Sequence, residues 1–257
     1  MEAGLPVLHS HRGSSYGGFV QPIGQSLDDC FWLVEGLIEE GRRLNFKKII
    51  MTLPPVIYNQ RLTNYLEFAL FRKHFSYLKR EISSVLFLED EPELNYAKFK
   101  PASLRAAHKA ERNGVTIQIS DDYEKFYAIL KKNLKIRHNV QPTHSLEELK
   151  LLAALYPESI RLYAAMLQET MIAGVVIFDA NPQVTLAFYI SHDEAYQEYR
   201  AVNLLFRELI ADSIKRRFRY LDYGIFTVNM EPNFGLARFK ESFGSSGIFR
   251  DTLVIDL

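Results

Sequence analysis

Three consecutive apolar segments in the second half of the chain constrain its fold more than any other feature. They cover residues 160–168, 171–179 and 184–191, and the pair Asn181-Pro182 marks a turn before the last of them. Segments of this length, rich in β-branched and aromatic residues and separated by turn signals, are typical of strands. The sequence therefore predicts a sheet built on three strands that follow one another directly.

Strand and helix patterns lie on both sides of these segments. A strand over 115–120 and two helices precede them, and the second helix begins with a capping box of Ser145 and Glu148. After them we expect a helix over 203–217, a strand over 220–226, a helix over 233–242 and a strand over 248–256. The order β, α, α, β, β, β, α, β, α, β predicts an α/β fold, an α+β mixed sheet with helices on its faces.

The first half of the chain has a shorter alternating pattern. Ser26 with Asp29 begins a helix that ends near Gly41. The other elements expected here are a helix over 62–74 and strands at 19–20, 48–53 and 77–88.

A charged helix over 103–112, ended by Asn113-Gly114, divides the two halves. We therefore predict a partial N-terminal domain over 1–101, a linking helix over 102–114 and a complete C-terminal domain over 115–257.

Composition narrows the class of protein. Acidic and basic residues number 31 each, which removes the basic surplus typical of non-specific nucleic-acid binders. The single cysteine, Cys30, lies on the apolar side of a predicted helix and is expected to be a small core thiol. The apolar run 172–178 is shorter than the roughly 20 residues of a membrane span, and the first residues lack a signal-peptide pattern. We expect a cytoplasmic protein without a membrane span.

Three motifs resemble those of one enzyme family. Phe239-Lys240 precedes Phe243-Gly244 in the predicted C-terminal helix, the strand before it contains Tyr220–Gly224, and residues 103–115 are rich in Arg and Lys. In this order they are similar to motifs of the Fem-type (FemAB- and FemX-like) aminoacyltransferases, a branch of the GCN5-related N-acetyltransferase (GNAT) superfamily. The resemblance implies a GNAT-like acyltransferase fold in tandem copies, with the N-terminal copy partial.

The first copy is expected to lack part of this fold. Residues 16–88 fit only its later portion, and a complete first domain needs roughly 50 more residues before Met1 by typical domain size. The long helical arm that some Fem proteins insert is also absent, which argues against transfer-RNA docking through such an arm.

The resemblance implies direct transfer of an acyl or aminoacyl group to an amine. Such a reaction depends on proximity and on charge stabilisation, and it needs no covalent nucleophile. Lys240 is the first candidate for stabilising negative charge, on the tetrahedral intermediate or on a donor phosphate. A solvated surface lysine is the alternative.

The donor is expected to bind where the central strand leads into its following helix. Free backbone N–H groups at a helix N-terminus suit a pyrophosphate. The residues assigned to this side, with Phe239 from the last helix, are Arg200, Ala201, Val202, Asn203 and Leu204. There is no glycine from 192 to 206, which departs from the acetyl-coenzyme A pattern and disfavours coenzyme A as donor.

The acceptor is expected to contact the loop from 137 to 144. Arg137, His138 and His144 lie there and are suited to orient a carboxylate or a sugar, although ordinary polar loop residues are an equal alternative. No nearby carboxylate or cysteine completes a metal site, so we predict no metal.

Three residues are candidate proton acceptors, namely His192, Asp222 and Tyr223. His192 fits best by chemistry because imidazole titrates near neutrality. Tyr189 is a further acceptor-side candidate. Because it alternates with Phe188 along the strand, we expect one of the two side chains to face the site and the other the core.

The leading prediction is an N-acyltransferase without a tightly bound cofactor. Acyl-coenzyme A and aminoacyl-transfer-RNA are the rival donors, and the acceptor is a small-molecule or cell-envelope-precursor amine, which makes the protein peptidoglycan-related. The alternative is a degenerate GNAT-like fold that binds a ligand or partner without catalysis. The oligomeric state is left open.

Overall fold

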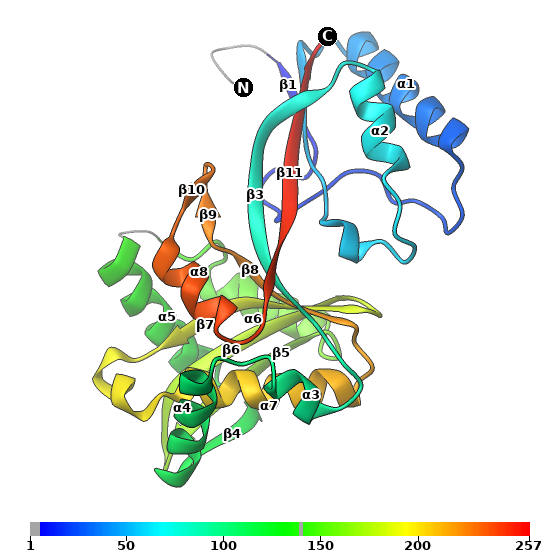
Figure 1. Cartoon of the computed structure of the whole chain (residues 1–257). Helices are drawn as coiled ribbons and strands as arrows, with labels where there is room; N and C mark the ends of the chain where they lie inside the picture. Colours follow the sequence, from blue (N-terminus) through cyan, green and yellow to red (C-terminus); the bar gives the residue numbers. More distant parts are fainter. Residues whose placement is uncertain (1–5, 139–140) are drawn as a thin grey trace. The chain divides into compact units, whose positions relative to one another are not determined.

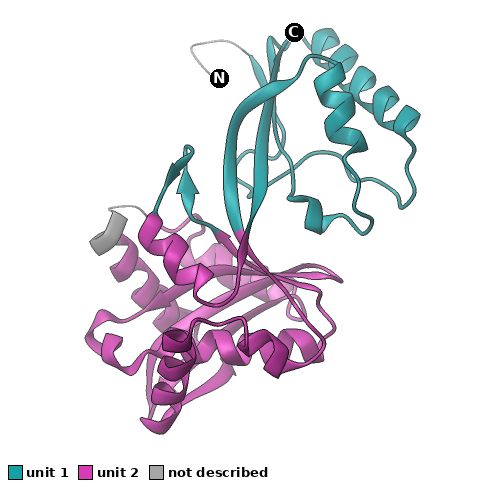
Figure 2. Ribbon diagram, viewed as in Figure 1, with its two compact units in different colours: residues 1–83, 225–233, 247–257 teal, residues 84–224, 234–246 magenta. Residues whose placement is uncertain are grey.

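The computed structural model describes residues 6–138 and 141–257, except for the side chains of 135–138. The chain forms two compact units that are discontinuous in sequence (Figure 2). Unit 1 contains residues 1–83, 225–233 and 247–257, and unit 2 contains residues 84–224 and 234–246. Two strands, β3 (Ser76–Phe87) and β11 (Ser246–Asp256), have residues in both units.

Unit 1 combines a small mixed sheet with two helices (Figure 1). Its elements are β1 (Val7–His9), α1 (Leu27–Arg43), β2 (Lys48–Thr52), the 3-10 helix η1 (Val56–Tyr58), α2 (Tyr65–Arg72) and the hairpin β9 (Thr227–Val228) and β10 (Glu231–Pro232). β2 pairs in parallel with β1 and antiparallel with β11. The core of the unit includes Val34, Leu70 and Leu253.

Unit 2 holds a central sheet with the strand order β8-β7-β6-β5-β4. Its strands are β4 (Val115–Ser120), β5 (Ile160–Leu167), β6 (Thr170–Asn181), β7 (Val184–His192) and β8 (Tyr220–Ile225). Its helices are α3 (Pro92–Tyr96), α4 (Pro101–Arg112), α5 (Tyr123–His138), α6 (Leu146–Leu155), η2 (Glu194–Tyr199), α7 (Ala201–Lys215) and α8 (Phe234–Glu241). β4 to β7 are antiparallel, whereas β7 and β8 are parallel.

Two hydrophobic cores cover the two faces of this sheet. The core on the α4 and α7 face includes Val175, Phe206 and Leu221. The core on the α5 and α6 face includes Phe126 and Val176. Neighbouring residues of β6 thus contribute to opposite cores, as alternation along a strand requires. We refer to the second surface as the α5/α6 face.

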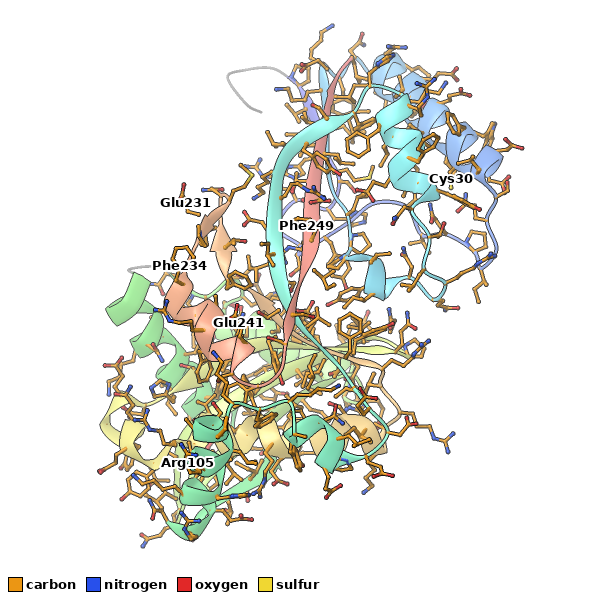
Figure 3. All side chains as sticks on the ribbon, viewed as in Figure 1. Cys30, Arg105, Glu231, Phe234, Glu241 and Phe249 are labelled. Atoms are coloured by element: carbon orange, nitrogen blue, oxygen red, sulfur yellow. The ribbon has the colours of Figure 1, made fainter. Side chains whose placement is uncertain are left out.

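The mixed α/β fold and the order of elements from 115 onward are confirmed. Both predicted capping boxes are present, at Ser26 with Asp29 and at Ser145 with Glu148. Cys30, labelled in Figure 3, is buried in α1, and burial raises the pKa of its thiol. The division at 101 and 115 into a partial copy, a linking helix and a complete copy stays a prediction.

Two details of the expected secondary structure are wrong. The first strand is β1 at Val7–His9, whereas the expected strand at 19–20 is an irregular segment. Val20 is fully exposed and Gly18 has a φ of 114°, a conformation that favours glycine and does not fit a strand. The loop predicted to begin at Arg137 is wrong at its start, because α5 continues to His138.

Residues in unit 2 pack so closely around Gly174 that a single added methyl group is expected to clash with them. A Cβ there lies 2.6 Å from Phe126 Cδ2, a ring atom in the buried core. Gly174→Ala is therefore expected to lower the free energy of unfolding by about 1–3 kcal/mol, measured by urea denaturation. Gly36→Ala is the matched control, because Gly36 lies in α1 with open space around it and should gain about 0.5–1 kcal/mol. Equal effects would refute this account of the packing.

Candidate functional site

The pairing of β7 with β8 sets the position of the site. The parallel register of these strands runs from Val184 beside Tyr220 to Leu186 beside Asp222. β7 then continues to His192 along its other neighbour, β6. The carboxyl half of β7 thus extends beyond this register, immediately before η2 and α7.

Lys240 reaches the end of β8 from α8, the helix whose two ends are marked by Phe234 and Glu241 in Figure 3. Its side chain is buried, with the residue only 4% exposed. The Lys240 Nζ donates a hydrogen bond of 2.8 Å to the Gly224 carbonyl. Gly224 has a φ of 75°, which favours glycine, and its missing side chain leaves a Cβ position 3.8 Å from the ammonium group.

Asp222 meets the same glycine from within β8. Its carboxylate accepts a hydrogen bond of 2.7 Å from the Gly224 N–H, and the residue is 2% exposed. The carboxylate and the ammonium group therefore hold the two polar backbone groups of one residue. Charge-assisted bonds of this kind are stronger than neutral ones and fix the end of the strand.

The register assigns Asp222 to one face of the sheet. Asp222 lies beside Leu186 on β7, and Leu186 lies beside Phe178 on β6. Residues in one such row point to the same side of a sheet. Because Phe178 packs against the core beneath α5 and α6, the side chain of Asp222 points to the α5/α6 face.

Tyr223 points to the opposite face. Its ring stacks on Phe206 with centroids 4.7 Å apart, and it is 1% exposed. Burial raises the pKa of its hydroxyl, so this group stays protonated near neutral pH. Phe239 and Phe243 pack edge to face at 5.1 Å in the same aromatic cluster. The two phenylalanines of the sequence motif that contains Lys240 therefore pack on one another and on Phe206.

A β-bulge in β7 overturns the expected alternation of Phe188 and Tyr189. Val176 of β6 pairs with Tyr189 and the next residue, Ile177, pairs with Ala187, which leaves Phe188 as the extra residue. A bulge of this kind changes the direction of the side chains that follow it. Phe188 and Tyr189 consequently both pack on the α5/α6 face, and the prediction that they point to opposite sides is wrong.

His144 packs over these aromatic residues from the segment before α6. Its ring centroid lies 5.4 Å from that of Phe188 and 6.3 Å from that of Phe178, two rings that stack on each other. Its Nδ1 lies 3.0 Å from the Tyr189 hydroxyl. His144 and Tyr189, assigned separately to the acceptor side from the sequence, are in direct contact.

The proposed donor segment lies at the start of α7. Arg200 is exposed and adopts a left-handed conformation with a φ of 56° between η2 and α7. The next four side chains are buried, from Ala201 to Leu204. Asn203 donates a hydrogen bond of 3.4 Å to the Ser103 carbonyl of α4. These side chains anchor the helix, so any donor contact in this segment falls to Arg200 and to the backbone.

His192 lies at the carboxyl end of β7, half-buried, with its carbonyl bonded to Asn133. It follows Leu186, the neighbour of Asp222, by six residues, or roughly 20 Å of extended strand. His192 therefore lies well along β7 from the group formed by Asp222, Gly224 and Lys240. The side chains of Arg137 and His138 fall outside the described residues.

Two contributors to this site were not anticipated from the sequence. Tyr127 of α5 donates a hydrogen bond of 3.0 Å to the His144 carbonyl, and Phe178 supplies one of the stacked rings. The sequence pattern assigned Tyr127 to a helix and Phe178 to a strand, but it did not indicate which residues they contact.

Neither a group of metal-ligating side chains nor a membrane-crossing helix is found in the part of the chain that the structure describes. In residues 6–138 and 141–257, no three His, Cys, Asp or Glu side chains are grouped so as to hold a metal ion. Within the same residues, no helix combines the length and the apolar character that crossing a membrane requires.

The model of the acetyltransferase (GNAT) domain family matches residues 98–241. Comparison with curated protein sequences finds no match. Among solved structures, FemX has a TM-score of 0.73 at 12% identity, covering 93% of this chain and 79% of that one. The C-terminal domain of a putative lysylphosphatidylglycerol synthetase from Agrobacterium fabrum has a TM-score of 0.63 at 11% identity, covering 89% and 73%. A tandem GNAT protein from the clavulanic acid biosynthesis pathway has a TM-score of 0.53 at 10% identity, covering 98% of this chain and 76% of that one.

The chain belongs to the GNAT acetyltransferase domain family, because the family model covers more than half of it. The structural likenesses, all at low identity, show the same fold. The resemblance noted in the sequence is thereby confirmed, and the protein is an acyltransferase.

The contact between Asp222 and Gly224 gives a test of how the site is held. Asp222→Ala removes the acceptor of the half-buried Gly224 N–H and is expected to lower the free energy of unfolding by about 1–3 kcal/mol. Asp222→Asn keeps an acceptor oxygen and should lose less, as measured by thermal and urea unfolding. Loss of turnover in Asp222→Asn with an unchanged Tm would show that the carboxylate acts as a proton acceptor. Its role would then not be limited to stabilising the end of β8.

Proposed function

We propose that the protein is an N-acyltransferase that moves an acyl or aminoacyl group from an activated donor directly to an amine. The observation that carries the proposal is the buried Lys240 ammonium group at the end of β8, beside the part of β7 that extends beyond its pairing with β8. A fixed cation with little access to water stabilises developing negative charge more strongly than a solvated lysine does.

The proposed reaction has a single tetrahedral intermediate. The nitrogen lone pair of the acceptor forms a bond to the donor carbonyl carbon, and negative charge develops on the carbonyl oxygen. Collapse of the intermediate breaks the bond to the leaving sulfur or oxygen. One amine proton passes to a base, and a proton is returned to the leaving group. We assign charge stabilisation to Lys240. Of the candidate proton acceptors, Asp222 lies at the same glycine as Lys240, whereas His192 lies roughly 20 Å of extended strand beyond Leu186, the neighbour of Asp222.

Acyl-coenzyme A and aminoacyl-transfer-RNA are the two donors to compare. Likeness to FemX supports the aminoacyl donor, as does the absence of glycine from 192 to 206. Membership of the acetyltransferase family supports the coenzyme A thioester. In either case we assign the donor to the start of α7, where exposed Arg200 is available for a phosphate.

We propose that the acceptor is a small-molecule or cell-envelope-precursor amine. FemX and a lysylphosphatidylglycerol synthetase domain are among the similar structures, which supports this class. The acceptor side consists of Tyr189 and His144, with Arg137 and His138 as further candidates.

Lys240→Met is expected to reduce kcat/KM at least 100-fold, because removal of one positioned donor to a developing oxyanion costs about 3 kcal/mol. Release of free thiol or of deacylated transfer-RNA measures the rate. Arg238→Met is the matched control, because Arg238 is an exposed cation on the same helix and should leave the rate unchanged. Equal rates for Lys240→Met and the unsubstituted protein would remove Lys240 from the mechanism.

The donor is identified by offering each candidate separately. We expect one class, either coenzyme A thioesters or aminoacyl-transfer-RNA, to raise the Tm and to acylate an amine panel, as detected by mass spectrometry. A donor at 100 times its Kd stabilises the fold by about 2.7 kcal/mol, which gives a clear Tm shift. The proposal fails if neither class shifts the Tm or yields an acylated amine.

A further inference from the structure

The segment 234–246, which contains α8 and Lys240, is held in unit 2 by the bonds that it makes there (Figure 2). The chain reaches this segment from residues 225–233 and leaves it into residues 247–257, and both of these stretches belong to unit 1. The position of the Lys240 ammonium group within unit 2 therefore depends on side-chain and backbone contacts of the segment itself.

Ser242, directly after α8, makes two such contacts at the start of α4. Its carbonyl accepts a hydrogen bond of 2.9 Å from the N–H of Lys100, the N-cap residue of α4. Its hydroxyl lies 2.8 Å from the hydroxyl of Ser103, and both serines are buried. Two groups of one residue thus hold the end of α8 against the start of α4.

The direction of the bond between the two serines follows from a third group. The Ser242 hydroxyl lies 2.6 Å from the Phe239 carbonyl, which can only accept, so Ser242 donates its single proton there. The Ser242 oxygen must then accept the proton of Ser103. A directed hydrogen-bond chain thus runs from Ser103 through Ser242 to the Phe239 carbonyl. This carbonyl belongs to the planar peptide group that carries the N–H of Lys240.

The helix α4 is a fixed base for this chain because α7 bonds to it near both ends. The Asn203 amide, in the first turn of α7, donates to the Ser103 carbonyl at 3.4 Å. The Arg207 guanidinium makes two bonds, of 2.9 and 3.0 Å, to the Glu111 carboxylate. Ser103 therefore contacts the helix assigned to the donor through its carbonyl, and the segment of Lys240 through its hydroxyl.

We infer that Ser103 and Ser242 are positioning residues for Lys240, which set where its ammonium group lies relative to a donor at the start of α7. The Gly224 carbonyl fixes the tip of the lysine, and the serine chain fixes the backbone from which its side chain starts. Stabilisation of a developing charge depends on where the stabilising group lies, so loss of a serine hydroxyl should slow transfer although the lysine is still present. The effect on transfer rests on the proposed function, whereas the hold on Lys240 is a property of the protein alone.

The hold on Lys240 can be measured without substrate. In ¹H–¹⁵N correlation spectra of the lysine ammonium groups, buried Lys240 is expected to give a signal that exchanges slowly with water and is absent in Lys240→Met. Ser242→Ala and Ser103→Ala should each speed this exchange by about fivefold or more. Ser213→Ala is the matched control, because Ser213 is a buried serine that bonds the Leu209 carbonyl within its own helix. Exchange at the wild-type rate in Ser242→Ala overturns the inference.

Kinetics distinguish a positioning role from general damage to the fold. Ser242→Ala is expected to lower kcat about tenfold and to leave KM for the donor within about twofold, because the start of α7 is unaltered. Ser213→Ala should change neither constant. In the Lys240→Met background, Ser242→Ala should have no further effect, because the group that it positions is gone. A similar loss in both backgrounds would show that Ser242 acts independently of Lys240, which contradicts the inference.

The two serines are expected to act as one unit. Because either substitution breaks the same chain, the double variant Ser103→Ala, Ser242→Ala should match the slower single variant in kcat within about twofold. Losses that multiply would contradict a single chain. If the wild type transfers no acyl group to any amine, the proposed function fails and the ammonium exchange result still stands.

Discussion

The two hydrogen bonds that meet at Gly224 determine how the rest of the site is arranged. Asp222 holds its N–H and Lys240 holds its carbonyl, so a residue of α8 and a residue of β8 fix the two peptide groups on either side of Gly224. Both charged groups are buried, so these bonds offset part of the desolvation penalty of the ammonium group and of the carboxylate. The positions of α8, β8 and the candidate catalytic charge are therefore set together.

The bulge at Phe188 has a comparable effect on the other strand. A regular β7 would send Phe188 and Tyr189 to opposite faces, and only one of them would belong to the surface beneath His144. The extra residue brings both to the α5/α6 face. The Tyr189 hydroxyl can then contact His144 Nδ1, while the stacked rings of Phe188 and Phe178 lie beneath the His144 imidazole. The bulge at Phe188 thus places two side chains of β7 on the candidate acceptor site instead of one.

Local signals in the sequence were sufficient for most of the fold. Ser145 with Glu148 marked the start of α6, and apolar segments bounded by turn signals marked β5, β6 and β7, because these features depend on neighbours within a few positions. The bulge depends on pairing between strands and has no local signature. The contact between His144 and Tyr189 joins residues 45 positions apart and was equally inaccessible. Most lysines are exposed, so the burial of Lys240 became evident only once α8 was seen against β8.

The discontinuity of unit 1 has a consequence for synthesis of the chain. Within this unit β11 lies between β2 and β3, and Thr252 of β11 pairs with Thr52 of β2. The small sheet of the N-terminal residues thus lacks an inner strand until residues 247–257 have left the ribosome. Domains usually fold as their residues emerge, from the N-terminus onward. Part of the apolar surface of α1 and α2 therefore stays uncovered until β11, which supplies Leu253 and Ile255 to the same core, has been made.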